Sequence, residues 1–298
     1  MGEVFRGVRG LAFALAPLTA AALWGGMFVV SEWSFASIPP VTLAFLRVAL
    51  GAAVLLPVVW YDGQRLPRSE WRRVAALAGW VALTLVTQFV GTDLTNASQG
   101  SLVTILTPVA TVALGALVLG ETVTRRRAVG VGLAVLGTVV VLAGQYDFTA
   151  LAGGSLLGIL GLVVASVAWA VYTIHGTPLV REYSALATTA YSAAAAVPIM
   201  AVFAAAELAV VGVPALPGPV GVAAVGYLGV AATAAAWYLW YRGVESVDAG
   251  TVAVFFFVQP VVGTALGVLV LDESVGAGFV AGGVVMAAGI WLVSTERD

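Results

Sequence analysis

The chain has 298 residues, of which 61% are apolar and only 9% charged, and its formal net charge is −2. A soluble domain carries about 25% charged residues, so this chain could not cover a water-exposed surface, and we expect it to lie in a lipid bilayer. It has no cysteine and one histidine, His175, which excludes disulfides and Cys-ligated metals and argues against a histidine metal cluster or a Ser-His-Asp relay.

Apolar stretches follow one another from the first residues to the last, and a bilayer-spanning helix needs about 20 such residues. Ten stretches qualify, at 11–32, 40–61, 74–94, 97–119, 128–145, 155–177, 185–207, 218–242, 248–271 and 278–294. They lack the period-two alternation of a β-barrel, so helices are predicted. The first stretch imitates a signal peptide, but apolar segments continue after it, and we expect it to remain as the first span.

The arginines predict how these spans face, because cytoplasmic segments are enriched in basic residues. With both termini inside and ten spans, every arginine outside the spans or at the inner end of a span is cytoplasmic. They are Arg6, Arg9, Arg65, Arg68, Arg72, Arg73, Arg125, Arg126, Arg127, Arg181, Arg242 and Arg297. Nine or eleven spans would break this pattern. The chain is therefore predicted to be a multi-pass protein of the cytoplasmic membrane with cytoplasmic N- and C-termini.

A repeat links the two halves of the chain. "PVATVALGALVLGETVTRRRAVG" from Pro108 and "PVVGTALGVLVLDESVGAGFVAG" from Pro260 match at 11 of 23 positions, at a constant offset of 152 residues. Because each half holds five spans, an odd number, the second half enters the membrane from the opposite side. The sequence thus predicts an all-α membrane protein of ten transmembrane helices in two inverted five-helix repeats, 1–148 and 149–298, an architecture typical of secondary transporters.

Two halves that each carry "P…ALG.LVL.E" before a glycine-rich last helix resemble the EamA family of the drug/metabolite transporter superfamily. The stretch "LWGGMFVVSEWSFASIPPVTLAFLRVALGAAVLLP" resembles the opening helices of that family, with Trp24, Gly25 and Arg47 in place, and "VAWAVYTIHG" around Trp169 is a weaker counterpart. The resemblance covers essentially the whole chain and implies an exporter of a small metabolite. Family members often have lysine where this chain has Glu32, so no contact is carried over from that lysine.

Prolines in the middle of spans 4 and 9 give the first candidate site. Proline donates no backbone hydrogen bond, so the carbonyls of Thr104 and Phe256, four residues before Pro108 and Pro260, are expected to lose their usual partners. Broken helices related by pseudo-symmetry are typical of a substrate site near the bilayer midplane. Gln259 adds a polar group at the same depth. A packing kink is the alternative, and the sequence does not separate the two.

Mid-span aromatic residues suggest an apolar cavity wall. Trp24 and Trp169 occupy roughly equivalent places in the two halves, and Tyr172, Trp237, Tyr241 and Phe255 to Phe257 lie at similar depth. Each alone is more often a packing residue. The predicted substrate-binding residues are Trp24, Arg47, Thr104, Pro108, Trp169, Tyr172, Tyr241, Phe256, Gln259 and Pro260.

Arg47 is the one arginine that lies in the interior of a span rather than at its end. A charge there costs about 2–3 kcal/mol on insertion scales, so we expect either an ion pair with Glu32, which we favour slightly, or an anionic group of the substrate. Glu121 and Glu273 each precede a helix, where a carboxylate can accept hydrogen bonds from free N–H groups, and a capping role is expected for both. Glycines in spans 5 and 10, among them Gly130, Gly137 and Gly289, predict close helix approach.

The leading functional hypothesis is a secondary transporter, with export as the expected direction. A membrane-embedded enzyme or a passive channel for small solutes is the alternative, but the sequence has neither a polar catalytic cluster nor a polar helix stripe. No cofactor or metal is expected. The expected partners are a small-molecule substrate and the lipid bilayer, without nucleic acid, and a homodimer is left open.

Overall fold

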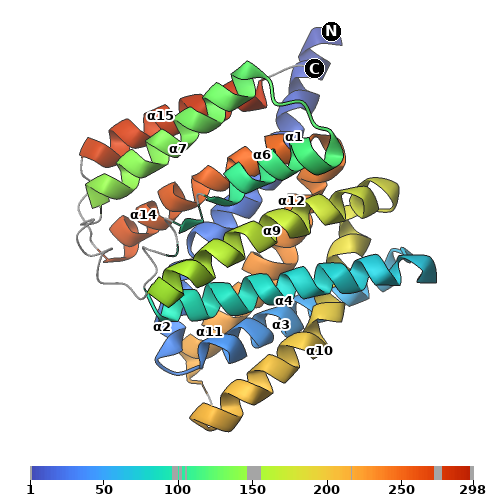
Figure 1. Cartoon of the computed structure of the whole chain (residues 1–298), viewed down its shortest axis with the longest axis vertical. Coiled ribbons are helices and arrows are strands. Elements are labelled where there is room, and N and C mark those ends of the chain that lie inside the picture. The colour runs from blue at the N-terminus through green and yellow to red at the C-terminus, as the bar shows by residue number, and fades with distance from the viewer. Residues whose placement is uncertain are drawn as a thin grey trace.

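The computed structural model describes residues 2–95, 100, 103–104, 106–145, 156–215, 217–271 and 277–295. Over these residues the chain is helical and holds no strand, as the sequence predicts (Figure 1). The helices are α1 (Gly2–Gly25), α2 (Met27–Phe35), α3 (Pro40–Tyr61), η1 (Arg68–Glu70), α4 (Trp71–Asp93), α6 (Leu106–Leu119), α7 (Arg125–Gln145), α9 (Leu156–Glu182), α10 (Ala185–Val211), α11 (Pro219–Gly226), η2 (Tyr227–Ala235), α12 (Ala236–Ser246), α13 (Ala249–Ala253), η3 (Val254–Phe257), α14 (Val258–Leu271) and α15 (Ala277–Ser294).

Each predicted span coincides with one helix or with a run of consecutive helices, although the start of the span 97–119 falls largely outside the described residues. Within the described part of the chain, six runs are long and apolar enough to cross a membrane: Ala14–Phe35, Pro40–Tyr61, Arg68–Asp93, Leu156–Glu182, Ala185–Val211 and Pro219–Ser246. Shorter apolar helices lie at Leu106–Leu119, Ala249–Gly263 and Val280–Ser294. The structure therefore establishes a multi-helix membrane protein, and the number ten stays a prediction.

Helix ends show how local sequence fixes these boundaries. Ser184 begins α10, where its Oγ accepts a hydrogen bond of 3.0 Å from the N–H three residues later, and Gly212 ends it with a φ of 84° that favours glycine. Glu207, near the end of α10, accepts hydrogen bonds from the N–H groups of Val41 (2.9 Å) and Thr42 (2.7 Å). The carboxylate thus satisfies free donors at the start of α3 and joins it to α10.

Among the spans that the structure describes along most of their length, three depart from a regular α-helix. The first is interrupted at Gly26, between α1 and α2. The eighth contains η2, a nine-residue π-helix, and the ninth contains η3, a four-residue 3-10 helix just before Pro260. Such irregular turns inside helices are frequent at functional sites. Trp24 and Met27, on either side of Gly26, and Phe256 of η3 line the interior cavity described below, whereas η2 lies behind it and bonds to Trp24 and Arg47.

The helices pack in matched pairs. α4 packs against α9 as α12 packs against α1, and α6 packs against α9 as α14 packs against α1. α3 packs against α10, and α7 lies along α15 at one side of the molecule (Figure 1). In this last pair a Cβ added to Gly137 would lie 2.4 Å from Met286 N, and one added to Gly289 would lie 2.5 Å from Gly130 O. The predicted close approach of these glycine-bearing helices is confirmed.

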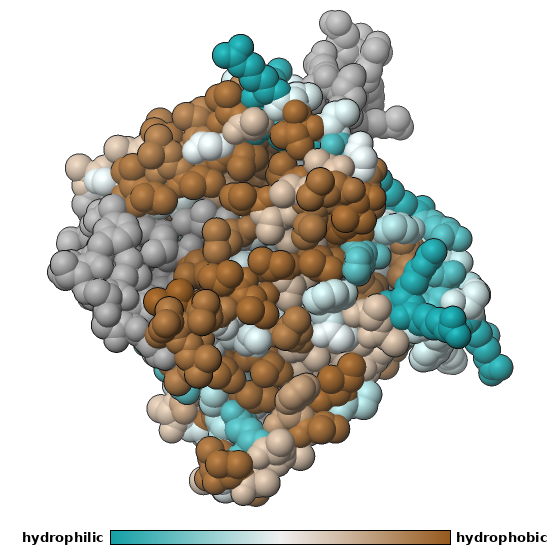
Figure 2. Space-filling view, in the orientation of Figure 1, coloured by the Kyte–Doolittle hydropathy of each residue, from teal (hydrophilic) through white to brown (hydrophobic). Residues whose placement is uncertain are grey.

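The molecular surface is that of a lipid-embedded protein. Hydrophobic residues cover most of the face seen in Figure 2, and hydrophilic ones gather at the edge where α4 begins. Many large apolar side chains are exposed, and Leu117, Val210 and Trp60 are each more than three-quarters exposed. A contiguous apolar surface of this extent indicates contact with lipid.

Candidate functional site

A small cavity of about 40 Å³ lies where helices from both halves of the chain meet. Six of the ten predicted site residues line it: Trp24, Arg47, Thr104, Trp169, Phe256 and Gln259. They come from α1, α3, the turn before α6, α9, η3 and α14. Ligand pockets usually measure about 300–1,000 Å³, so the cavity in this conformation has room for a few water molecules and must widen to admit an organic molecule.

Aromatic rings form one wall of the cavity. Trp24 packs edge-on against Trp169 with ring centroids 5.4 Å apart, and packs at a tilt of 37° against Phe256 with centroids 5.1 Å apart. Trp237 of α12, whose ring centroid lies 5.4 Å from that of Trp169, also lines the cavity. These separations are typical of favourable aromatic pairs. The tryptophans expected to be equivalent in the two halves are therefore in direct contact across the site.

Arg47 is 1% exposed and reaches the cavity from α3. Its guanidinium donates from Nε to Thr233 Oγ1 (2.8 Å), from Nη2 to the carbonyl of Ala232 (2.9 Å) and from Nη1 to Met27 Sδ (2.9 Å). The expected ion pair with Glu32 is not formed, because among the described residues every hydrogen-bond partner of Arg47 is neutral. Its guanidinium carbon also lies 5.6 Å from the ring centroid of Phe89, at a distance typical of a cation–π contact.

The π-helix η2 explains why Arg47 turns into the second half of the chain. The Ala232 carbonyl accepts from Arg47 and also from Trp24 Nε1 at 2.8 Å, so one carbonyl of η2 holds two residues of the first half. α3 comes close because Gly51 faces η2: a Cβ there would lie 2.6 Å from Thr233 Cγ2. Because Gly51 has no side chain, η2 approaches α3 closely enough for the Thr233 hydroxyl to reach the guanidinium of Arg47, one helical turn before Gly51.

Several polar atoms facing the cavity have no hydrogen-bond partner within the described part of the chain. They are Thr84 Oγ1, Trp169 Nε1 and Gln259 Oε1. Buried polar groups are nearly always satisfied, so unpaired ones around a cavity indicate water or a ligand. Gln88 also lines the site, and neither it nor Thr84 was predicted. Their spacing of four residues, which places two polar side chains on one face of an apolar span, is the signal that could have found them.

The remaining predicted residues lie beside the cavity or behind it. Pro108 and Pro260 line a narrow crevice that they share with Thr104 and Phe256. The expectation that the Thr104 carbonyl loses its partner is wrong: it accepts from Thr107 N at 3.0 Å, in a tighter turn that restores the bond removed by Pro108.

Tyr172 and Tyr241 are fully buried and pack behind Trp169. The Tyr241 hydroxyl donates to the Tyr172 carbonyl at 2.9 Å, and the Tyr172 hydroxyl lies 3.1 Å from Ser192 Oγ. Neither tyrosine lines the cavity. Within this structure they hold the aromatic wall in place rather than face its interior.

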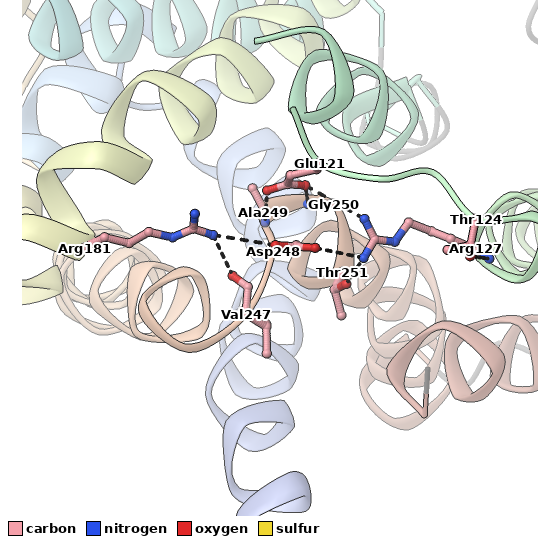
Figure 3. Close-up of polar contacts among 9 residues, drawn as sticks. All are labelled: Glu121, Thr124, Arg127, Arg181, Val247, Asp248, Ala249, Gly250 and Thr251. Carbon is pink, nitrogen blue, oxygen red and sulfur yellow. Dashed lines mark hydrogen bonds and ion pairs between the residues drawn. The ribbon is translucent and has the colours of Figure 1, made fainter. Parts of the chain in front are cut away.

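A second polar group lies at the start of α7 and α13, between the two halves of the chain (Figure 3). Glu121 accepts from the N–H groups of Ala249 (2.8 Å) and Gly250 (3.0 Å). Its expected capping role is confirmed, but the helix that it caps belongs to the other half, and its own following helix is capped by Thr124 Oγ1, which accepts from Arg127 N at 3.0 Å. The corresponding Glu273 lies outside the described residues.

Arg127 holds this group together. Its guanidinium donates from Nη2 to Asp248 Oδ2 (3.1 Å) and to Thr251 Oγ1 (3.0 Å), and its Nη1 lies 4.0 Å from Glu121 Oε2. Arg181 approaches the other carboxylate oxygen of Asp248 at 3.9 Å. The side chains of Arg127 and Glu121 are only 4% exposed. We call Glu121, Arg127, Arg181 and Asp248 the arginine–carboxylate cluster; it joins α7 and α9 to the start of α13.

Comparison with known proteins agrees with this architecture. The sequence model of the EamA-like transporter family matches residues 10–143 and 156–295. An uncharacterized transporter of Archaeoglobus fulgidus is 32% identical over 176 residues, 58% of this chain and 60% of that protein. The uncharacterized transporter YyaM of Bacillus subtilis is 25% identical over 181 residues, 56% of each chain. The chain thus matches less than two thirds of the length of these relatives.

A solved crystal structure has the same fold. It superposes with a TM-score of 0.75 over 94% of this chain and 96% of its own, at 22% sequence identity. At that identity the likeness concerns the arrangement of the helices alone, because one fold can serve many functions.

Proposed function

Because the chain belongs to the EamA-like transporter family, we propose that it is a secondary transporter that exports a small organic metabolite across the cytoplasmic membrane by alternating access. The observation that carries the proposal is the small cavity between the two halves, whose lining includes polar atoms without a partner among the described residues. Substrate sites of such transporters lie near the midplane at the interface between repeats.

The matched packing of the helices supports two inverted five-helix repeats. One set of five consists of α1–α2, α3, α4, α6 and α7, and the other consists of the five spans from α9 to α15, taken in the same order. If each helix is replaced by its counterpart in the other set, the contact between α4 and α9 becomes the contact between α12 and α1. The same exchange turns α6–α9 into α14–α1 and leaves α3–α10 and α7–α15 unchanged. Two sets related in this way can rock against each other around a fixed central site, which is the basis of alternating access.

The arginine–carboxylate cluster supports a closed inner side. It joins the two halves through the connection that precedes α7 and the start of α13, both of which lie on the side that the arginine pattern assigns to the cytoplasm. Opening the cavity to that side would require the contacts of Arg127 with Asp248 and Thr251 to break. In this proposal the cluster is the inner gate, and the conformation described is closed to the cytoplasm.

Flux through the protein tests the proposed function. Inverted vesicles should take up at least one solute of a metabolite panel with saturating kinetics, measured with and without a proton gradient. Ala165→Trp should abolish this uptake, because Ala165 is buried on the cavity wall. Val167→Trp on the same helix is the control, since Val167 is 43% exposed to the outside. Uptake that rises linearly with concentration would instead indicate a channel, and no protein-dependent uptake would contradict transport.

The orientation is tested on the same chain, which is free of cysteine. Single cysteines at Ser37 and Val213, both exposed in turns on the predicted outer side, should react with a membrane-impermeant thiol reagent added to intact cells. Cysteines at Ser69 and Val123 should react only after the cells are opened. Labelling of Ser69→Cys in intact cells would reverse the proposed orientation.

A further inference from the structure

The charge balance of the cavity is unusual for a site inside a membrane. Arg47 is the one ionisable side chain among the described residues that line it, and an arginine side chain stays protonated in proteins. All three of its hydrogen-bond acceptors are neutral: a hydroxyl, a carbonyl and a thioether. No carboxylate of the described residues lies within ion-pair distance of it. The site therefore carries one buried positive charge that no described side chain neutralises.

Neutral acceptors compensate this charge only in part. A guanidinium has five N–H donors in a planar fork, and three of them are engaged with Thr233, Ala232 and Met27. One N–H on each terminal nitrogen is left, and Arg47 faces the cavity. Paired N–H groups of a guanidinium can donate to the two oxygens of a carboxylate. Because the surroundings are apolar, an anion here would be attracted far more strongly than in water.

The other residues that line the cavity indicate which chemical groups the rest of the ligand would carry. Its walls include the rings of Trp24, Trp169, Trp237 and Phe256, which favour an apolar or planar group. Gln259 Oε1 has no donor and Trp169 Nε1 has no acceptor among the described residues. A ligand with an O–H or N–H group of its own could satisfy Gln259, since an unpaired buried acceptor is costly.

We propose that the transported substrate is a small organic monoanion, held by its carboxylate at Arg47 with an apolar or aromatic body against the tryptophan wall. This rests on the proposed function and narrows its substrate class. A cation would meet the positive charge without a counter-charge. A dianion would bring a second negative charge that no cationic side chain of the described cavity wall could neutralise, at high cost in a low dielectric.

Equilibrium binding to the purified protein in detergent tests the substrate class separately from transport. The probes are carboxylates paired with their neutral amides: benzoate with benzamide, 3-phenylpropionate with 3-phenylpropionamide, and isovalerate with isovaleramide. Quenching of the cavity tryptophans and thermal stabilisation report binding. The carboxylate of at least one pair should bind tenfold or more tightly than its amide, and more tightly than phenethylammonium, a cation, or phthalate, a dianion.

Variants of Arg47 test whether this side chain causes the preference for the carboxylate over the amide. Arg47→Gln should bind the carboxylate and its amide about equally, whereas Arg65→Gln, which removes an exposed arginine outside the spans, should keep the full preference. If Arg47→Gln does not fold, Arg47→Lys keeps the charge but loses the planar fork, and should show a reduced preference.

The outcomes separate this proposal from the proposed function. If no pair favours the carboxylate in the parent protein, or if Arg47→Gln keeps the preference, the monoanion proposal is wrong, whether or not the protein transports other solutes. If carboxylates bind at Arg47 but never cross the membrane in vesicles, the substrate class of the site stands and the transport function fails.

Discussion

Gly137→Leu is expected to destabilise the folded protein more than the same substitution at Gly130 or Gly132 of α7. A Cβ at this position would lie 2.4 Å from Met286 N and 2.6 Å from the Gly282 carbonyl oxygen, both backbone atoms of α15. Backbone atoms cannot rotate away as a side chain can, so the two helices would have to separate along their length. Overpacking typically costs about 1–3 kcal/mol, occasionally more, and helix association in lipid depends on such close contact.

Gly132 on the same helix provides a matched control. A Cβ at this position would meet nothing within 4 Å, so Gly132→Leu should leave stability unchanged or raise it slightly, because glycine is a poor helix former. Thermal stability of the purified variants in detergent, followed by the loss of the monodisperse peak, measures both. Equal stability of the two leucine variants would show that the α7–α15 contact is not as tight as the structure has it.

Much of the fold can be predicted from the sequence because its signals are local. Every predicted span is occupied by helix where the residues are described, since a run of about 20 apolar residues can satisfy its backbone in lipid only as a helix. The glycines of α7 and α15 were identified for the same reason, as small residues in two long apolar segments. That Arg47 needs a compensating partner can also be predicted from the sequence, because a charge inside a membrane span is costly wherever its partners lie in the chain.

The partners themselves could not be predicted, because they lie far away in the chain and belong to backbone irregularities. Arg47 bonds to Thr233 and Ala232, more than 180 residues later, in a π-helix that no composition or periodicity marks. Glu32 was the expected partner only because a short loop separates the two spans. Glu121 likewise caps α13 of the other half, since the nearest free N–H groups in space are not the nearest in sequence.

Thr84 and Gln88 show why a search of the sequence for single conspicuous residues misses part of the site. Neither is charged or aromatic, and each alone resembles an ordinary polar residue in a span. Together they place two polar side chains on the cavity face of α4, and only the fold shows that Arg47 and Trp169 share that cavity.

Arg127→Gln is expected to open the inner side of the protein and to lower the transport rate. Arg127 is buried and bonds to Asp248 and Thr251 across the interface between the halves. Removing one member of a buried ion pair costs about 3–5 kcal/mol, but Asp248 is 30% exposed and keeps some hydration, so we expect about 2 kcal/mol. Since about 1.4 kcal/mol changes an equilibrium tenfold, the closed conformation should lose roughly 30-fold in relative population.

Accessibility of the cavity measures this shift without knowledge of the substrate. A cysteine in place of Thr107, a buried residue of the cavity wall, should react slowly with an impermeant thiol reagent applied to inverted vesicles of the parent. Combined with Arg127→Gln it should react at least tenfold faster, because the site spends more time open to the cytoplasmic side. Arg125→Gln, which removes an exposed arginine from the same run, should leave the labelling rate unchanged, and Arg127→Lys should fall between. If Arg127→Gln folds normally and neither labelling nor transport changes, the cluster joins the two halves structurally without gating the cavity.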